Sequence, residues 1–136
     1  MPTLFDPIDL GAIHCPNRIL MAPLTRGRAD PGHIPNDMMR LYYEQRASAG
    51  LIISEATGIS QEGLGWPSAP GIWTDAQTEG WKPVTEAVHK ADGRIILQLW
   101  HMGRLVHSSY NNGPGVSSSV CPKPMTFLPM RRARSA

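Results

Sequence analysis

The chain has 136 residues, of which 41% are hydrophobic and 18% charged, a composition typical of one globular domain and not of a disordered polypeptide. Its formal net charge of +2 is too small to indicate a nucleic acid or an anionic membrane as a partner. Cys15 and Cys121 lack metal-ligand spacing, and the sequence shows neither a secretory signal nor an apolar run long enough to span a bilayer. We therefore expect a cytoplasmic protein without a metal site.

The first half of the sequence predicts a hairpin, a strand, a helix and a second strand. Residues 4–15 place apolar positions on both sides of Gly11 and predict a small β-hairpin. Residues 18–22 predict the first strand, and residues 35–49 predict a helix that ends before a glycine. The second strand follows at residues 51–56. One face of the helix carries Met38, Leu41, Tyr42 and Gln45.

The second half predicts a long loop, a second helix and a third strand. Residues 58–73 are rich in Gly and Pro, and a loop of this length inside a compact domain is usually functional. Thr74 followed by Gln77 predicts a capping box at the start of the helix. Pro83 is expected either to kink that helix or to mark its true first turn. Residues 94–99 form the third predicted strand.

Each predicted parallel strand runs into polar side chains at its carboxyl end. The first ends near Thr25, the second near Glu55 and the third at Gln98, Trp100 and His101. This β-α-β-α-β order, with polar groups gathered beyond the strand ends, favours the start of a (β/α)8 barrel. A doubly wound sheet is the alternative, but the turn after the first strand has no G-x-G-x-x-G character. We therefore predict an α/β fold with an N-terminal hairpin and three adjacent parallel strands in chain order.

The same residues are specific enough to indicate a family. Five blocks, in order, resemble the N-terminal part of the Old Yellow Enzyme family of FMN-dependent ene-reductases, which are TIM barrels. The first is Pro-Asn-Arg-Ile at 16–19 followed by Ala-Pro-Leu-Thr-Arg at 22–26, and the others are the segment 42–57, Pro-Gly-Ile-Trp at 70–73, Trp-Lys-Pro-Val at 81–84 and the segment 97–104. The resemblance covers residues 3–119 and implies that the chain holds the first three βα units of a (β/α)8 barrel, an incomplete barrel by itself.

The resemblance implies a set of cofactor-binding residues at the strand ends. Pro23, Leu24 and Thr25 would lie beside the FMN isoalloxazine, and the Thr25 hydroxyl would hydrogen-bond the flavin near its C4 carbonyl. Ala56 would lie close to the pyrimidine ring, where a larger side chain would collide. Gln98 would pair with the pyrimidine edge, because a carboxamide offers a donor and an acceptor together.

Other positions have more than one reading. The resemblance implies that Trp100, together with Thr25, lines a substrate pocket, although a tryptophan taken alone is more often part of a core. Arg26 and Arg104 either bind a phosphate or form structural ion pairs. Glu55 is expected to pair with a neighbouring base. His101 and His107 are given no catalytic role, and the catalytic residues stay unknown because the family's substrate-binding pair and proton-donating Tyr come later in its sequence.

The resemblance stops before the end of the chain. We place the flavin oxidoreductase portion at residues 1–119 and predict that residues 120–136 form an unmatched, disordered tail. The expected function is that of an FMN-dependent NAD(P)H oxidoreductase that reduces activated alkenes, with an enone-type small molecule as substrate, here in truncated form. The alternative is an inactive remnant, or an interaction module that self-associates through its open strand edges.

Overall fold

The computed structural model describes residues 1–111, 115–116 and 118. The predicted tail, residues 120–136, lies outside the described residues. The elements in chain order are β1 (Ile8–Leu10), β2 (Ile13–Cys15), β3 (Leu20–Met21), α1 (Asp37–Glu44), β4 (Leu51–Gly58), α2 (Asp75–Lys90), β5 (Ile95–Trp100), the 3-10 turn η1 (Gly103–Leu105) and α3 (Ser108–Asn111).

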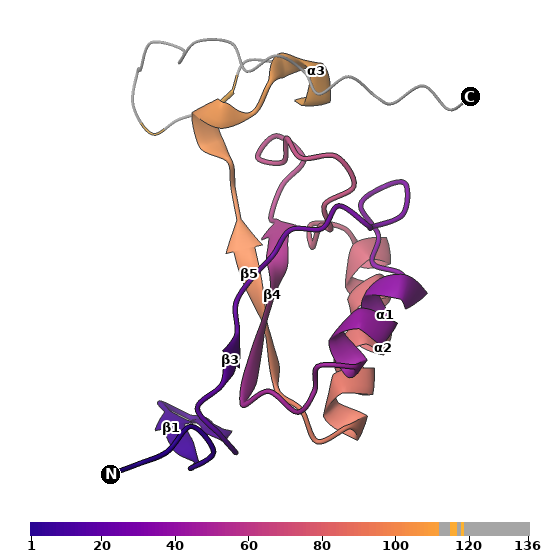
Figure 1. Ribbon diagram of the computed structural model, residues 1–136. Coiled ribbons are helices and arrows are strands. Elements are labelled where there is room, and N and C mark those ends of the chain that lie inside the picture. The colour runs from indigo at the N-terminus through magenta and orange to yellow at the C-terminus, as the bar shows by residue number, and fades with distance from the viewer. Residues whose placement is uncertain (112–114, 117, 119–136) are drawn as a thin grey trace, which may run out of the picture.

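The sheet topology agrees with the sequence prediction. Strands β3, β4 and β5 form one sheet in that order, and both pairings are parallel. Leu20 is paired with Leu51 at one end of the sheet, and β1 pairs with β2 in a separate antiparallel hairpin. Figure 1 shows this hairpin at the amino end of the parallel strands, opposite the end at which β4 and β5 finish. The three predicted parallel strands and their order are therefore confirmed.

Helices α1 and α2 cover one face of the sheet, and the core lies between them and β4 (Figure 1). The core is formed by large side chains from all three elements: Met39 and Tyr43 of α1, Ile52 of β4, and Trp81, Val84 and Val88 of α2. These side chains are at most 3% exposed. Burial of this apolar surface between the helices and β4 is the main stabilising term of the fold.

Helix α1 differs from its prediction in length and in the face that it buries. It ends at Glu44 instead of Ala49, because the chain then tightens into turns in which the Arg46 N–H donates to the Tyr43 carbonyl at 3.0 Å. The buried face carries Met39 and Tyr43, whereas Met38 and Leu41 are 59% and 49% exposed. The predicted apolar face is therefore rotated by about one position from the one that packs on the sheet.

Helix α2 begins as the sequence predicts. Thr74 accepts a hydrogen bond from the Gln77 N–H, and the Gln77 side chain accepts one from the Thr74 N–H, which completes the capping box. Pro83 lies in the interior of the helix and does not mark its first turn. Asp92, with a positive φ of 57°, turns the chain out of the helix toward β5.

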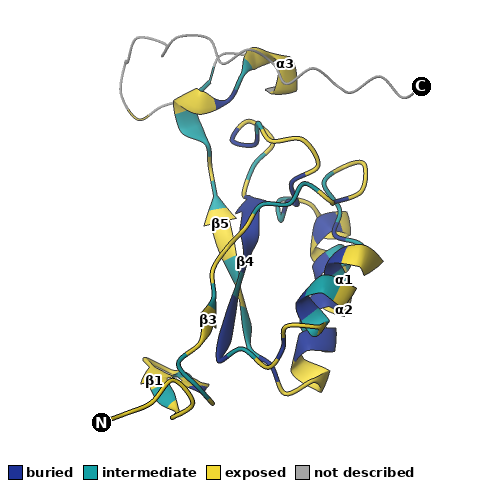
Figure 2. Ribbon diagram, in the orientation of Figure 1, coloured by how far each residue is buried: buried dark blue, intermediate teal, exposed yellow. Residues whose placement is uncertain are grey.

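The face of the sheet opposite the helices has no cover from the described residues (Figure 2). Apolar side chains on this face are exposed as a result, among them Leu20 of β3 at 45% and Ile96 of β5 at 39%. Leu99, which alternates to the other face near the end of β5, is also 65% exposed. The central strand β4 is almost entirely buried. Within the described part of the chain, no helix has the length and apolar character needed to cross a bilayer.

Candidate functional site

The carboxyl ends of β4 and β5 are brought together by an irregularity in their pairing. Ile53 pairs with Ile96, but Ala56 pairs with Gln98, so β4 contains one extra residue between these two points. Ser54 stabilises the bulge, because its Oγ accepts the Gln98 N–H at 3.1 Å and donates to the Glu55 carbonyl at 2.9 Å. The bulge places Ala56 and Gln98 side by side in register.

Gln98 lies on the sheet face that the helices leave open. Ile95 and Leu97 pack against the core, so the alternation of side chains along a strand turns Gln98 to the other face. Gln98 is exposed, as this placement requires, and Trp100 follows on the same face by the same alternation. Because Glu55 faces the helices, Ala56 next to it belongs to the face of Gln98.

Thr25 joins this site through the residues on either side of it. Leu24 lines a groove beside Tyr42, and the Arg26 guanidinium stacks over the Tyr42 ring at 3.4 Å, so both neighbours lie on the α1 side. Thr25, between these two neighbours, is half-buried, and in an extended segment its side chain would point away from theirs, toward the open face. The Arg26 N–H donates to the Glu55 carboxylate at 3.2 Å and ties this segment to β4. Pro23 and Leu24 are both exposed.

Glu55 is buried, being 1% exposed, and its partners differ from the base expected from the sequence. The carboxylate accepts the Tyr43 hydroxyl at 3.2 Å and the Arg26 backbone N–H, and no ion pair forms between the Arg26 and Glu55 side chains in the described structure. Burial raises the pKa of the Glu55 carboxyl, while the hydrogen bonds from Arg26 and Tyr43 and the Arg26 charge act in the opposite direction. Burial and the nearby carboxylate raise the pKa of Tyr43, so its phenol remains a donor.

Sequence reasoning did not assign a role to Tyr43 or to Ser54, although both hold the site in shape. Tyr43 was not singled out, because the apolar pattern of the helix predicted a different buried face. Ser54 and Glu55 could have been noticed as two consecutive polar residues in a strand that the structure buries almost completely. Such residues are costly to bury without partners, so they are a usable signal of a hydrogen-bonded site.

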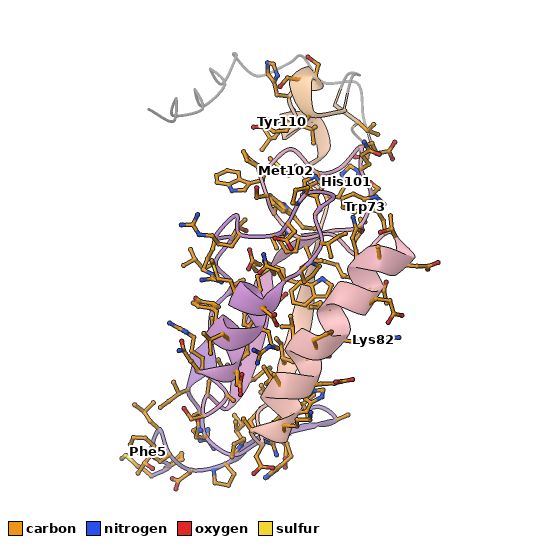
Figure 3. The ribbon with its side chains drawn as sticks, turned by 90° about the vertical axis from the view of Figure 1, so that its right-hand side faces the viewer. Phe5, Trp73, Lys82, His101, Met102 and Tyr110 are labelled. Atoms are coloured by element: carbon orange, nitrogen blue, oxygen red, sulfur yellow. The ribbon has the colours of Figure 1, made fainter. Side chains whose placement is uncertain are left out.

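The loop between β4 and α2 packs against the segment that follows β5. The Met102 N–H donates to the Gly63 carbonyl at 2.7 Å, and a side chain at Gly63 would collide with the His101 ring. Figure 3 shows Trp73, His101, Met102 and Tyr110 at the same end of the molecule, with Phe5 at the opposite end. His101 is exposed, and its Nδ1 accepts the Gly103 N–H, which is a structural role.

Two hollows lie near the site without containing its three central residues. A cavity of about 250 Å³ at the start of α2 is lined in part by His33, Trp73 and Gln77, and an open groove of about 420 Å³ separates β3 from α1. Leu24 lines that groove, whereas Thr25, Ala56 and Gln98 line neither hollow. Among the described residues, no group of three or more His, Cys, Asp or Glu side chains could hold a metal ion.

The residues present on the open face are suited to a planar heterocycle with polar edges. Within the described structure, the Gln98 carboxamide and the Thr25 hydroxyl make no hydrogen bond to other protein groups. A carboxamide and a hydroxyl can together donate to and accept from an edge that carries carbonyl and N–H groups, as the flavin pyrimidine does. Ala56 contributes only a methyl group between them. The donor set therefore fits the cofactor that the sequence resemblance implies.

The fold and this open strand-end site define a protein of the βα-barrel class, and the comparisons with known proteins identify its family. The family model of the NADH:flavin oxidoreductase / NADH oxidase family matches residues 3–133. The chain belongs to this family. The match extends beyond residue 119, where the resemblance seen in the sequence ends.

Solved relatives show the same arrangement. The old yellow enzyme homologue from Zymomonas mobilis is 64% identical with a TM-score of 0.85, over 88% of this chain and 34% of that one. The old yellow enzyme from Trypanosoma cruzi is 41% identical with a TM-score of 0.84, over 93% of this chain and 37% of that one. The chain thus has the fold of the first three βα units of an old yellow enzyme barrel.

A curated relative is the putative 12-oxophytodienoate reductase-like protein 2A of Arabidopsis thaliana. It is 40% identical over 141 residues, which cover 97% of this chain and 52% of that protein. The putative 12-oxophytodienoate reductase 4 of Oryza sativa subsp. japonica is 45% identical over 79% of this chain and 28% of its own length. The chain therefore spans about half or less of these relatives.

Proposed function

We propose that this chain is the flavin-binding N-terminal portion of an FMN-dependent NAD(P)H oxidoreductase that reduces activated alkenes. The observation that carries the proposal is the in-register placement of Ala56 and Gln98 on the open sheet face, with Thr25 tied to the same strand end. Family membership supports a flavin and a nicotinamide reductant. One relative, morphinone reductase, is known in complex with tetrahydroNAD.

The residues of this chain would bind and orient the cofactor. Gln98 would hold the pyrimidine edge, Thr25 would donate to or accept from the ring near its C4 carbonyl, and Ala56 would leave room for the ring to approach the sheet. Pro23 and Leu24 would border the ring beside Thr25. FMN, when bound, would supply the redox chemistry. The hydrogen bond from Thr25 would influence how readily the cofactor is reduced.

A substrate pocket would lie beyond the ring, with Trp100 and Thr25 on its wall. An enone-type small molecule is the substrate class that the family suggests. In the family, the groups that bind the substrate carbonyl and supply the proton come from later parts of the barrel. This chain would therefore contribute cofactor binding and part of the pocket, whereas turnover would require the remaining strands.

A hybrid protein tests the proposal. Residues 1–111 of this chain would replace the matching part of the Zymomonas mobilis relative, which is 64% identical over the aligned region. We expect a yellow protein that oxidises NADPH with cyclohexenone, whereas the 136-residue chain alone should be colourless and inactive. A colourless hybrid, prepared beside a yellow parent, would show that these residues do not fit the cofactor.

A substitution in the hybrid then tests the site itself. Gln98→Leu should weaken FMN binding by about 1–3 kcal/mol, because it removes a paired polar contact. Gln45→Leu is the matched control, since Gln45 is exposed at the end of α1 in the helix layer. Equal FMN affinity in the two variants would contradict the assignment of Gln98.

A further inference from the structure

The bulge in β4 turns one acidic residue away from the open face and into the helix layer. Glu55 lies inside the irregular stretch between Ile53 and Ala56. Its carbonyl accepts two side-chain hydroxyls, from Ser54 at 2.9 Å and from Thr57 at 3.0 Å, which fixes the backbone at this point. The orientation of the Glu55 side chain is therefore set by local hydrogen bonds and not by strand pairing alone.

Tyr43 makes two hydrogen bonds to Glu55. The Tyr43 hydroxyl accepts the Glu55 backbone N–H at 2.8 Å and donates to Oε1 of the same residue at 3.2 Å. Tyr43 is itself anchored in the core of α1, 1% exposed and in ring contact with Tyr42 and Trp81. One carboxylate oxygen is thus occupied, and the other, Oε2, is directed at the segment after β3.

Oε2 accepts the backbone N–H of Arg26 at 3.2 Å. Burial of a carboxylate destabilises the folded state unless its oxygens accept hydrogen bonds, and an apolar residue at this buried position would avoid that free-energy cost. The Arg26 side chain does not satisfy it, because its guanidinium stacks on Tyr42 and its Nε and Nη2 atoms are buried without hydrogen-bond partners. What the carboxylate holds is the main chain next to Thr25.

We propose that Glu55, held by its two hydrogen bonds to Tyr43, is a positioning residue that fixes the segment carrying Thr25 against the carboxyl end of β4. The Thr25 hydroxyl is thereby directed to the flavin edge. This inference rests on the proposed function for the role of Thr25. The link runs from the core of α1 through Glu55 to the Arg26 amide, one residue from the hydroxyl. The ionisable groups that face Glu55 are Tyr43 on α1 and Arg26 on the segment after β3.

The test follows individual backbone amides by NMR in the isotope-labelled 136-residue chain. In the unaltered chain, the Arg26 amide should be protected from hydrogen exchange, and its proton shift should follow the titration of Glu55. Glu55→Ala should reduce this protection about tenfold or more, the factor expected when a hydrogen bond to a charged acceptor is lost. Glu55→Gln should retain most of it, because the carboxamide oxygen can still accept the N–H, but the pH response should disappear.

Control variants separate positioning from general stability. Glu44→Gln removes an exposed carboxylate that pairs with Arg40 on α1 and should leave the Arg26 amide unchanged. Tyr43→Phe keeps the ring but removes the two hydrogen bonds to Glu55. It should therefore lower the protection of the Arg26 amide from hydrogen exchange, while the Val88 amide in α2 stays protected. This variant also decides the matter if Glu55→Ala does not fold. Unchanged Arg26 protection in folded Tyr43→Phe or Glu55→Ala chains would overturn the proposal.

Addition of FMN distinguishes this inference from the proposed function. If the proposed function and the positioning role both hold, FMN should change the amide chemical shifts of Thr25 and Gln98 in the unaltered chain. In Glu55→Ala or Tyr43→Phe the change at Thr25 should disappear while the change at Gln98 remains. A Thr25 shift that survives in these variants would overturn the positioning role. An absence of FMN-induced shifts in the unaltered chain would count against the proposed function, whereas the exchange data would still decide whether Glu55 holds the Arg26 segment.

Discussion

Replacement of Gly50 by alanine should destabilise the protein through a collision between two backbone segments. A Cβ atom at this position would lie 2.1 Å from the Asn17 carbonyl oxygen and 3.0 Å from the Asn17 Oδ1 atom. Ordinary contacts of this kind begin at about 3.4 Å, so one segment must move by about 1 Å. The φ of Gly50 is not positive, so the residue does not end the helix in a left-handed conformation. A glycine is required here because the Asn17 backbone approaches too closely for a side chain.

Neither segment can move freely. The Gly50 N–H donates to the Ile19 carbonyl at 2.8 Å, and the Asn17 side chain donates to the Ser48 carbonyl at 3.0 Å. Relief of the collision would separate β3 from the start of β4 and break at least the first of these bonds. We expect a cost of about 1–3 kcal/mol for the overlap and about 1 kcal/mol for the hydrogen bond. The reduced freedom of the unfolded chain would offset up to about 1 kcal/mol.

The free energy of unfolding should therefore fall by about 1–4 kcal/mol in Gly50→Ala. Urea titrations followed by tryptophan fluorescence and far-ultraviolet circular dichroism would measure it. Gly11→Asn is a suitable control, because a Cβ at Gly11 meets no atom within 4 Å and asparagine tolerates its positive φ of 62°. If Gly50→Ala were as stable as the control, the close approach of β3 to β4, and with it the Leu20–Leu51 pairing, would be wrong.

Three further outcomes are expected. Trp81→Phe should lower the free energy of unfolding by about 1–3 kcal/mol in the same urea assay, because the Trp81 Nε1–H donates to the buried Gly71 carbonyl at 3.1 Å, which would be left unsatisfied; an unchanged midpoint would argue against this bond. The pKa of Glu55 is raised in the folded state, so its contribution to stability is present at low pH and is lost as the pH rises from below the ordinary value of 4.5 through the raised pKa. Urea midpoints across this range should show the loss in the unaltered chain and not in Glu55→Gln, and identical pH profiles would contradict it. The chain should also associate at high concentration through its open edge, and Leu99→Lys should reduce the association seen by analytical ultracentrifugation, since Leu99 is 65% exposed on β5; a purely monomeric chain would refute this expectation.

The sequence predicted the elements whose signal is local and repeated. Three apolar runs alternating with helical patterns indicated parallel strands in chain order, and Thr74 with Gln77 marked the start of α2 correctly. The end of α1 was not predictable in the same way. The chain must turn back toward β3 at Gly50, and it does so through tight turns that local helix propensity does not reveal.

The candidate site was predictable in composition but not in geometry. Alternation along β5 suffices to place Gln98 on the face opposite Leu97. Its pairing with Ala56 depends on the extra residue in β4, and a bulge shifts register by one position without a clear mark in the sequence. The partners of Glu55 were not predictable from the sequence either. The neighbouring base, Arg26, stacks its side chain on Tyr42, and its backbone N–H makes the hydrogen bond to the Glu55 carboxylate.

The most direct test of the central claim is a map of where FMN binds. The isotope-labelled chain would be titrated with FMN at concentrations high enough to populate a weak complex, and the backbone amide shifts would be followed by NMR. The account predicts that the largest shifts fall on Thr25, Ala56 and Gln98, at the carboxyl ends of the three parallel strands. Shifts confined to the cavity lined by His33 and Gln77, or to the groove between β3 and α1, would contradict it.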